Sequence, residues 1–144
     1  MGKVDYKIGS ILMDYKADAL EFFKGDIFAL ETTGIKIDEV KPGYAKCRLD
    51  VERKHLNARN FVMGGAIFTL ADFAMAVAAK ANGTPAVSLN LNINYVAPAS
   101  PPVIFAEAKC VKDGRNICFY EIVVANAEGD IVATASGSGY KAQK

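Results

Sequence analysis

The stretch MGGAIFTLADFAMAVAAK, residues Met63 to Lys80, decides the fold of this chain. Two glycines open an apolar run, and Asn82-Gly83 followed by Pro85 ends it, so the pattern predicts a helix over residues 64–80. At 1.5 Å per residue, such a helix is about 26 Å long. One carboxylate, Asp72, interrupts the run, and its burial would cost free energy unless it has a partner or a function.

The same run is almost long enough to cross a membrane, but we expect it to form the core of a globular domain. A central Asp costs roughly 2.5–3.5 kcal/mol on membrane-insertion scales, and the run is rich in Ala rather than Leu. The rest of the chain also supplies half-apolar strands that need a helix to cover them. We therefore expect no membrane partner.

Strand patterns occupy most of the remaining chain. Alternating apolar and polar residues, with Pro-Gly and Asp-Gly turns between them, predict strands on both sides of the long helix. Two precede the helix and four follow it, at residues 34–40, 44–51, 87–96, 103–112, 115–126 and 131–140. A shorter amphipathic helix is expected before all of them, over residues 13–24, with Gly25 as its end.

The order β-β-α-β-β-β-β indicates an α+β fold, in which one long helix lies against a strongly curved antiparallel sheet. Small residues indicate where the two meet, because the last strand places Ala133, Ala135, Gly137 and Gly139 on one face and the helix is rich in alanine. We expect a single domain over residues 1–144, in which residues 1–25 form an N-terminal extension and helix.

Composition restricts the kind of protein. The chain has 144 residues, of which 51% are apolar and 23% are charged, and this excludes intrinsic disorder. Its formal net charge is only +1, without the basic surplus typical of nucleic-acid binding, so no nucleic-acid partner is expected. The N-terminus has no long apolar segment, so we expect no signal peptide.

The odd number of cysteines favours a reduced, cytoplasmic protein. Cys110 and Cys118 flank the predicted turn at Asp113-Gly114. In simple hairpin register, Cys110 would face Ile117 and Cys118 would face Lys109. The two thiols would then point to opposite faces of the sheet and could not form a disulfide.

The start of the long helix and Asp72 together suggest catalysis. Asp72 follows Gly65 by seven residues, which places both on one helix face about 10 Å apart along the axis. Free N–H groups at the helix N-terminus could stabilise an oxyanion, and Asp72 could act as a base or nucleophile. Because 10 Å is too far for one carbonyl to touch both, either the two features are unrelated or a second copy of the helix completes the site.

Each of these features also has a purely structural explanation. Asp72 could face solvent, paired glycines are often turn residues, and the row Asn90, Asn92 and Asn94 is typical of a polar sheet face. His55, the only histidine, lies in a charged stretch and is expected at the surface. A single histidine excludes the usual zinc triads, and no GxSxG, P-loop or GxGxxG motif occurs, so we expect no metal and no bound cofactor.

HLN at His55–Asn57 and GGAIFTLADFA at Gly64–Ala74 resemble the signature of the hotdog-fold acyl-CoA thioesterases of the phenylacetic-acid-pathway (PaaI-like) type. The resemblance covers most of the chain from Asp26 onward, including FALETTGIKIDEVKPGYAKCRLDV, VSLNLNINYVAPA, KDGR and IVATASGSGY. It implies the hotdog fold and hydrolysis of an acyl-CoA thioester, in which coenzyme A is part of the substrate. It also implies a homodimer in which two subunits share each site, and often a homotetramer.

The resemblance further implies roles for individual residues. Asp72 matches the carboxylate that acts as general base or nucleophile, and Gly64, with Gly65 beside it, matches the residue whose amide polarises the thioester carbonyl. Asn57 matches the side chain that positions the water or the thioester. Ser88 matches an assisting Ser/Thr position, although strict alternation would place it on the face away from Leu89 and Leu91.

Two positions depart from the family pattern. Met63 stands where many members have His, which removes a hydrogen-bonding ring beside the site and adds an apolar side chain. Asn60 stands where many members have Gly, and Asn is the commonest non-glycine residue in the left-handed conformation, so the loop should keep its shape.

We expect apolar residues to line the acyl pocket, namely Phe61, Met63, Phe68 and Met75. We expect scattered cations to contact the phosphates of coenzyme A, namely Arg59, Lys112 and Arg115. Exposed cations are also commonly only solvated. Two other functions stay open on the same fold. Met63 is compatible with a non-hydrolytic acyl-CoA binder, and a hotdog dehydratase or hydratase comes third because it would pair a histidine with a carboxylate.

Overall fold

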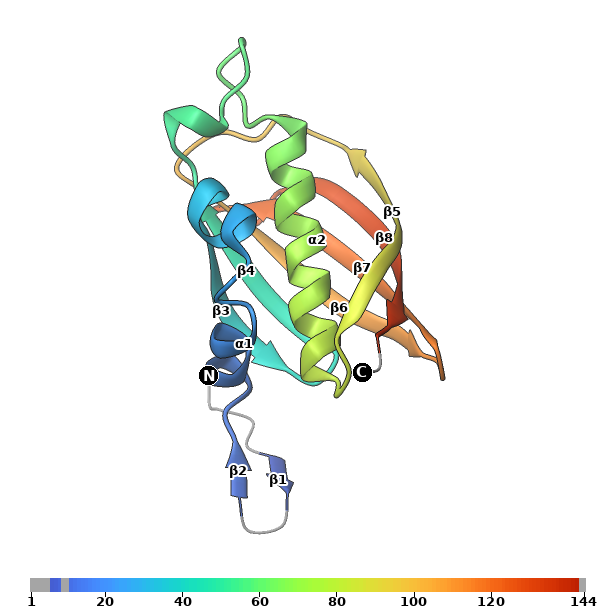
Figure 1. The fold of residues 1–144 in the computed structure, drawn as a ribbon. Coiled ribbons are helices and arrows are strands. Elements are labelled where there is room, and N and C mark those ends of the chain that lie inside the picture. Colours follow the sequence, from blue (N-terminus) through green and yellow to red (C-terminus); the bar gives the residue numbers. More distant parts are fainter. Residues whose placement is uncertain (1–5, 9–10, 143–144) are drawn as a thin grey trace.

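The computed structural model describes residues 6–8 and 11–142, in which one long helix, α2 (Gly64–Ala81), lies against a curved antiparallel sheet (Figure 1). The strands of this sheet are β3 (Ile35–Lys41), β4 (Tyr44–Asp50), β5 (Ala86–Tyr95), β6 (Val103–Asp113), β7 (Ile117–Asn126) and β8 (Ile131–Lys141). Their order in the sheet is β3-β4-β6-β7-β8-β5. This confirms the α+β hotdog architecture, and every one of these elements begins and ends within two residues of its prediction.

Small residues bring the helix close to the sheet, as the sequence predicts. A Cβ atom added at Gly137 would lie 2.6 Å from Met75 Sδ and 2.8 Å from Leu91 Cδ1. Ala71, Ala74 and Ala78 of α2 are fully buried. Larger side chains at these positions would push the helix away from β8 and β5.

The helix α2 is long and apolar enough to cross a membrane, but 56% of it is buried inside the fold. Its contacts are those of a core helix, since Leu70, Ala71 and Val77 are inaccessible to solvent. The placement agrees with the interpretation of this run as a core element.

The N-terminal region is more elaborate than predicted. The helix expected over residues 13–24 is the shorter α1 (Tyr15–Phe22), capped by the Asp14 carboxylate, which accepts the Ala17 N–H at 3.0 Å. Before it, β1 (Tyr6–Ile8) and β2 (Ile11–Met13) form a small hairpin that the sequence did not reveal, because three residues are too few for a period-two pattern. A π-helical turn (Phe28–Thr33) and a 3₁₀ turn (Arg53–His55) complete the elements.

The register of the β6–β7 hairpin differs from the prediction. A bulge between Cys110 and Lys112 shifts the register, so that Cys110 pairs with Tyr120 and Asp113 pairs with Cys118. Cys110 and Cys118 therefore lie on the same face of the sheet, and the expectation of opposite faces was wrong. All three cysteines are nevertheless free. Burial raises the pKa of the Cys47 thiol to about 12 and also raises the pKa values of Cys110 and Cys118.

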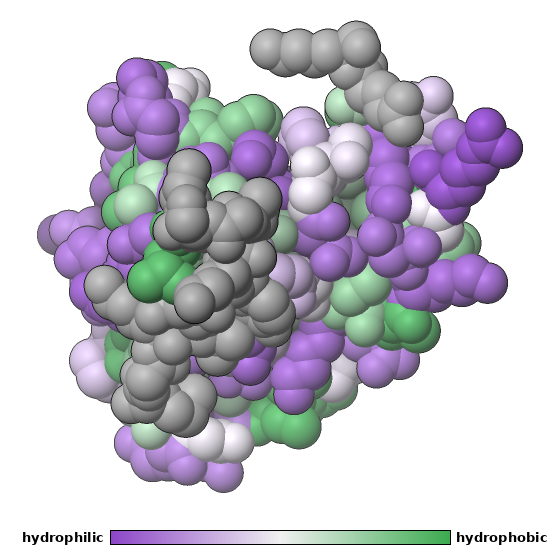
Figure 2. All heavy atoms as spheres, turned by 90° about the horizontal axis from the view of Figure 1, so that it is seen from below, coloured by the Kyte–Doolittle hydropathy of each residue, from purple (hydrophilic) through white to green (hydrophobic). Residues whose placement is uncertain are grey.

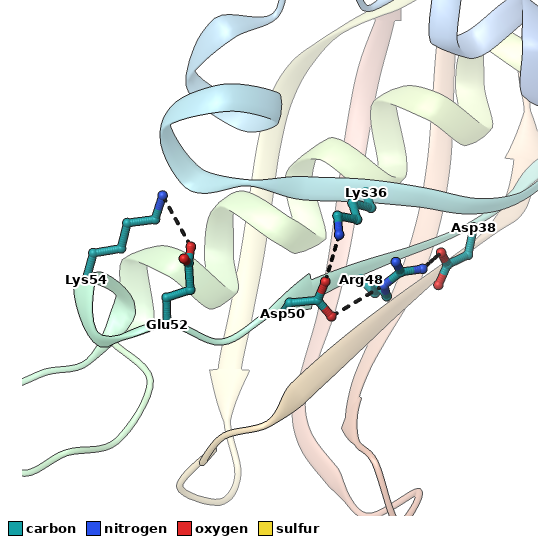
Figure 3. Close-up of polar contacts among 6 residues, drawn as sticks. All are labelled: Lys36, Asp38, Arg48, Asp50, Glu52 and Lys54. Carbon is teal, nitrogen blue, oxygen red and sulfur yellow. Dashed lines mark hydrogen bonds and ion pairs between the residues drawn. The ribbon is translucent and has the colours of Figure 1, made fainter.

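The two edges of the sheet differ in charge. On β3, Lys36 pairs with Asp50 of β4 at 3.0 Å and Asp38 pairs with Arg48, which also reaches Asp50 (Figure 3). The opposite edge, β5, has no charged residue over its ten residues, AVSLNLNINY. An edge strand with charged side chains resists pairing with a strand of another chain. Of the two edge strands, β5 is therefore better suited to such pairing than β3.

The lower end of the molecule is mainly polar. Viewed from below, hydrophilic residues cover most of the coloured surface, and hydrophobic residues form only small separate patches (Figure 2). The apolar exposed residues of β5 and its continuation, Val87, Leu89 and Val96, are 56–60% exposed and follow one another along the edge. The edge strand β5 thus carries several exposed apolar side chains in succession.

Candidate active site

The first turn of α2 presents two free amides. Met63 precedes the helix in an extended conformation, and its carbonyl accepts the N–H groups of Ala66 at 2.9 Å and Ile67 at 3.2 Å. The N–H groups of Gly64 and Gly65 have no acceptor among the described residues. Unpaired N–H groups at the positive end of a helix dipole are suited to an oxyanion or another anionic group.

Tyr95, at the end of β5, covers Gly64. Its hydroxyl donates to the Gly64 carbonyl at 2.9 Å, and a Cβ atom at Gly64 would lie 3.1 Å from the tyrosine Cζ. Nothing lies within 4 Å of the corresponding position at Gly65. Gly64 is therefore closed on this side by an aromatic ring, whereas Gly65 is open to a ligand. Sequence reasoning did not single out Tyr95, because its contact depends on where β5 ends relative to α2.

Asp72 and Ser88 are brought together. The Ser88 hydroxyl donates to Asp72 Oδ1 at 2.7 Å, and the carboxylate is partly buried. Strict alternation predicted the opposite face for Ser88, and this was wrong because a bulge at Leu89 shifts the β5–β8 register. Ser88 pairs with Gly139 and Asn90 with Ser138, so Ser88 points to the helix on the same face as Leu91.

One stripe of α2 stays partly open to solvent. Gly65, Thr69, Asp72 and Ala76, at spacings of four, three and four residues, are half-buried or exposed, whereas the residues on the opposite faces are buried. The stripe connects the free amides to the carboxylate along the side that faces β5, where Ser88 contacts Asp72. The amides and the carboxylate remain about 10 Å apart along the axis.

Asn57 shapes the loop before the helix. Its Oδ1 accepts the N–H groups of Arg59 at 2.9 Å and Phe61 at 3.2 Å. Its side-chain nitrogen has no partner among the described residues and is free to donate to a ligand. Asn60 has a φ of 62°, which confirms the left-handed conformation expected at this position.

His55 is buried, and the expectation of a surface position was wrong. The ring is only 5% exposed, its Nδ1 accepts the Glu52 N–H at 2.9 Å, and its Nε2 donates to the Thr33 carbonyl at 2.6 Å. Its backbone carbonyl accepts the Met63 N–H at 2.8 Å. His55 thus connects three segments immediately before the helix, and both ring nitrogens are occupied.

The residues expected around the substrate separate into groups. Met63 is 59% exposed and Phe68 is 36% exposed near the start of α2, with Phe61 half-buried in the adjoining loop, whereas Met75 is 1% exposed and belongs to the core. The loop that carries Arg59 lies at the top of Figure 1, and the β6–β7 turn next to Lys112 and Arg115 lies at the lower right. One chain does not bring these cations together.

Within residues 6–8 and 11–142, no group of three or more His, Cys, Asp or Glu side chains could hold a metal ion. The polar groups along and before α2 include a carboxylate with its serine partner, two helix amides and one side-chain amide. Such a set can activate water and stabilise negative charge on a carbonyl oxygen.

Known proteins resemble this chain in sequence. The family model described as the thioesterase superfamily matches residues 59–133, which is more than half of the chain. A protein of Archaeoglobus fulgidus that is named as an esterase is 38% identical over 112 residues, covering 77% of this chain and 73% of that protein. Human acyl-coenzyme A thioesterase 13 is 33% identical, with coverage of 69% and 74%. Acyl-coenzyme A thioesterase PaaI of Escherichia coli is 28% identical, with coverage of 90% and 94%.

Solved structures resemble it in fold. The E. coli PaaI protein superposes with a TM-score of 0.83 at 24% identity, covering 90% of this chain and 94% of that one. A Streptococcus mutans protein bound to acetyl CoA superposes with a TM-score of 0.73 at 28% identity, covering 76% and 90%.

Proposed function

The chain belongs to the thioesterase superfamily, and on that basis we propose that it hydrolyses acyl-CoA thioesters at a site that two copies of the chain complete. The observation that carries the proposal is the open stripe of α2. It holds a carboxylate fixed by Ser88 at one point and two unpaired amides at another, about 10 Å away along the axis. One thioester carbonyl cannot contact both within one chain.

The substrate class is supported by the relatives. The human and E. coli relatives are named acyl-coenzyme A thioesterases, and the S. mutans structure holds acetyl CoA. The exposed side chains of Met63 and Phe68, with Phe61 beside them, suit an apolar or aromatic acyl group. Met75 is left out of the acyl pocket because it lies in the core. The cysteines, which are free, support a cytoplasmic location.

The second copy pairs through β5 in this proposal. That edge is uncharged and exposes Val87 and Leu89, whereas Lys36 and Asp38 of the β3 edge form ion pairs. Antiparallel pairing of two β5 strands about a two-fold axis would continue the sheet and would bring each open helix stripe toward the other subunit. Asp72 of one subunit would then face the free amides of its partner. Two such dimers would form the homotetramer common in the family.

In the reaction, the thioester carbonyl oxygen accepts hydrogen bonds from the free helix amides, while Asp72 removes a proton from an attacking water molecule. The C–S bond breaks, the acid forms, and the coenzyme A thiolate takes up a proton. Ser88 donates to Asp72 Oδ1 and so orients the carboxylate with its other oxygen free. The Asn57 side-chain nitrogen positions the water or the thioester.

Direct attack by Asp72 is the other route, in which a mixed anhydride forms and water then hydrolyses it. A single turnover in ¹⁸O-labelled water tests for the anhydride. Label found in the Asp72 carboxylate after one turnover identifies an anhydride that water opens at the Asp72 carbonyl, whereas label found only in the product acid is expected both for the general base and for an anhydride opened at the acyl carbon.

A non-hydrolytic acyl-CoA binder is the second candidate function, because an exposed Met63 replaces the histidine common in the family. A dehydratase or hydratase lacks support, since both ring nitrogens of His55, the only histidine, are occupied in the core.

The test is a panel of short, long and aromatic acyl-CoAs with a thiol reagent that reports released coenzyme A. We expect turnover with at least one substrate, and we expect Asp72→Asn to remove most of it, because the amide keeps the acceptor for Ser88 but cannot take a proton. Tight binding without thiol release would identify the binder instead. Full turnover by Asp72→Asn at saturating substrate would exclude Asp72 as the catalytic group.

A further inference from the structure

The end of β5 lies beside the start of α2 (Figure 1), and one side chain connects them. The Tyr95 hydroxyl donates to the Gly64 carbonyl at 2.9 Å, and its ring lies against the position that a Gly64 side chain would occupy. The tyrosine is 49% exposed, so this hydroxyl could equally be solvated. A hydrogen bond from a half-exposed hydroxyl adds little to folding stability. We therefore expect its main effect to be on the peptide group whose carbonyl accepts it.

The Gly64 carbonyl and the Gly65 N–H belong to one peptide group. In an α-helix this carbonyl also accepts the N–H of the fourth following residue, here Phe68. The tyrosine supplies a second donor to the same oxygen, which draws electron density toward the oxygen and makes the opposite N–H a stronger donor. The Gly65 N–H has no acceptor among the described residues, and its surroundings are open.

We propose that Tyr95 is a positioning residue for catalysis, which fixes the Gly64–Gly65 peptide and strengthens the Gly65 N–H as a donor to the thioester oxyanion. This rests on the proposed thioesterase function. The role belongs to the hydroxyl group rather than the ring, because the ring alone would keep its contact with Gly64 after loss of the oxygen.

The substitution Tyr95→Phe isolates the hydroxyl. Removal of an oxyanion donor typically costs a factor of about 10²–10³ in kcat, and a neighbouring hydrogen bond changes a bond's strength by roughly 10–30%, so kcat should fall about two- to eightfold. KM and the order of preference among acyl-CoAs should not change. Tyr140→Phe is the matched control, since Tyr140 is also 49% exposed and its hydroxyl has no hydrogen bond in the described part of the chain.

A series of side chains at position 95 with graded hydroxyl acidity changes the strength of the hydrogen bond while the packing of the ring stays nearly the same. Site-specific replacement of Tyr95 by a fluorinated tyrosine, assayed where the phenol stays protonated, makes the hydroxyl a stronger donor. We expect kcat to rise in the order phenylalanine, tyrosine, fluorotyrosine.

Three results would overturn the proposal: equal kcat for Tyr95→Phe and Tyr140→Phe, a change confined to KM, or a loss that depends on acyl length. Absence of turnover in the wild-type protein would instead remove the proposed thioesterase function itself, so the two failures are distinguishable.

Discussion

Gly64 and Gly65 are adjacent but have different surroundings, and this predicts different effects of the same substitution. Gly65→Ala adds a methyl group that meets nothing within 4 Å. It should raise the free energy of unfolding by about 0.5–1 kcal/mol through helix propensity. It should also lower kcat/KM by about tenfold or more, since the methyl group lies on the open stripe beside the free amides. Thermal unfolding and acyl-CoA hydrolysis measure the two effects.

Gly64→Ala is the matched variant. Its methyl group would lie 3.1 Å from Tyr95 Cζ, so the ring has to move and its hydrogen bond is weakened. We expect lower activity without the gain in stability. A fully active Gly65→Ala enzyme would contradict the assignment of this stripe to the substrate.

Also at the residue scale, the raised pKa of Cys47 predicts that the free energy of unfolding depends on pH. Burial raises the pKa of this thiol from 9.0 to about 12, so the folded protein keeps it protonated where the unfolded chain ionises. Its contribution is complete below pH 9 and is lost as the pH rises toward 12. Cys47→Ala should therefore reduce the slope of unfolding free energy against pH in this window by up to about 1.4 kcal/mol per pH unit. An unchanged slope in urea unfolding at pH 9.5–10.5 would contradict this.

Single residues show which features could be predicted from the sequence and which could not. The left-handed Asn60 was predictable because the conformational preference is local to one residue. The face of Ser88 was not, because the bulge at Leu89 becomes visible only in the pairing of β5 with β8. The burial of His55 was not either, since its ring contacts the Thr33 carbonyl, which lies 22 residues away in the sequence.

At the scale of elements, strands and the long helix were predictable because their periodicity extends over seven or more residues. The predicted strand over 87–96 and the observed β5 (Ala86–Tyr95) differ by one residue at each end. The pairing registers of the strands were harder to predict from the sequence. The β6–β7 hairpin has an extra residue at the bulge near Val111, and nothing in its alternation marks that residue. Gly65 and Asp72 lie on one partly open face of α2, as their spacing predicts, whereas Tyr95 belongs to another element.

The hydrogen bonds of the His55 ring predict how much this residue stabilises the folded protein. Loss of its ring would leave the Glu52 N–H and the Thr33 carbonyl without partners, at about 1–3 kcal/mol for each buried group. His55→Ala should lower the free energy of unfolding by about 2–4 kcal/mol. His55→Asn can replace the acceptor and His55→Gln the donor, so each should recover part of that loss. Equal stability of wild type and His55→Ala in denaturant titrations would contradict this.

At the scale of the whole molecule, the asymmetry of the sheet edges is the main feature. The β3 edge carries ion pairs, and the β5 edge carries exposed Val87 and Leu89 beside the open helix stripe. We expect a dimer or larger assembly in solution, with β5 and the loop over 57–65 at the interface. A stable, folded monomer at micromolar concentration in sedimentation would contradict the shared site. The sequence alone suggested the second copy from helix geometry, and the uncharged edge now supports it.

The structure improves the choice of variants for testing which subunit supplies which group. Because Asn57 Oδ1 accepts two loop N–H groups, Asn57→Ala would disturb the loop. Asn57→Asp keeps that acceptor and replaces the donating nitrogen by a carboxylate oxygen, which also adds a negative charge. Asp72→Asn keeps the acceptor for Ser88 in the same way. Each variant should be folded and nearly inactive by itself.

The most direct measurement is the activity of these two variants after they are unfolded and refolded together in equal amounts. Half of the dimers are then mixed, and if Asp72 acts on the partner's substrate, each mixed dimer has one site with both defects and one intact site. We predict recovery to about a quarter of the wild-type rate, with mixed dimers verified by a mass tag on one variant. No recovery above the separately refolded variants, despite verified mixed dimers, would contradict the shared site.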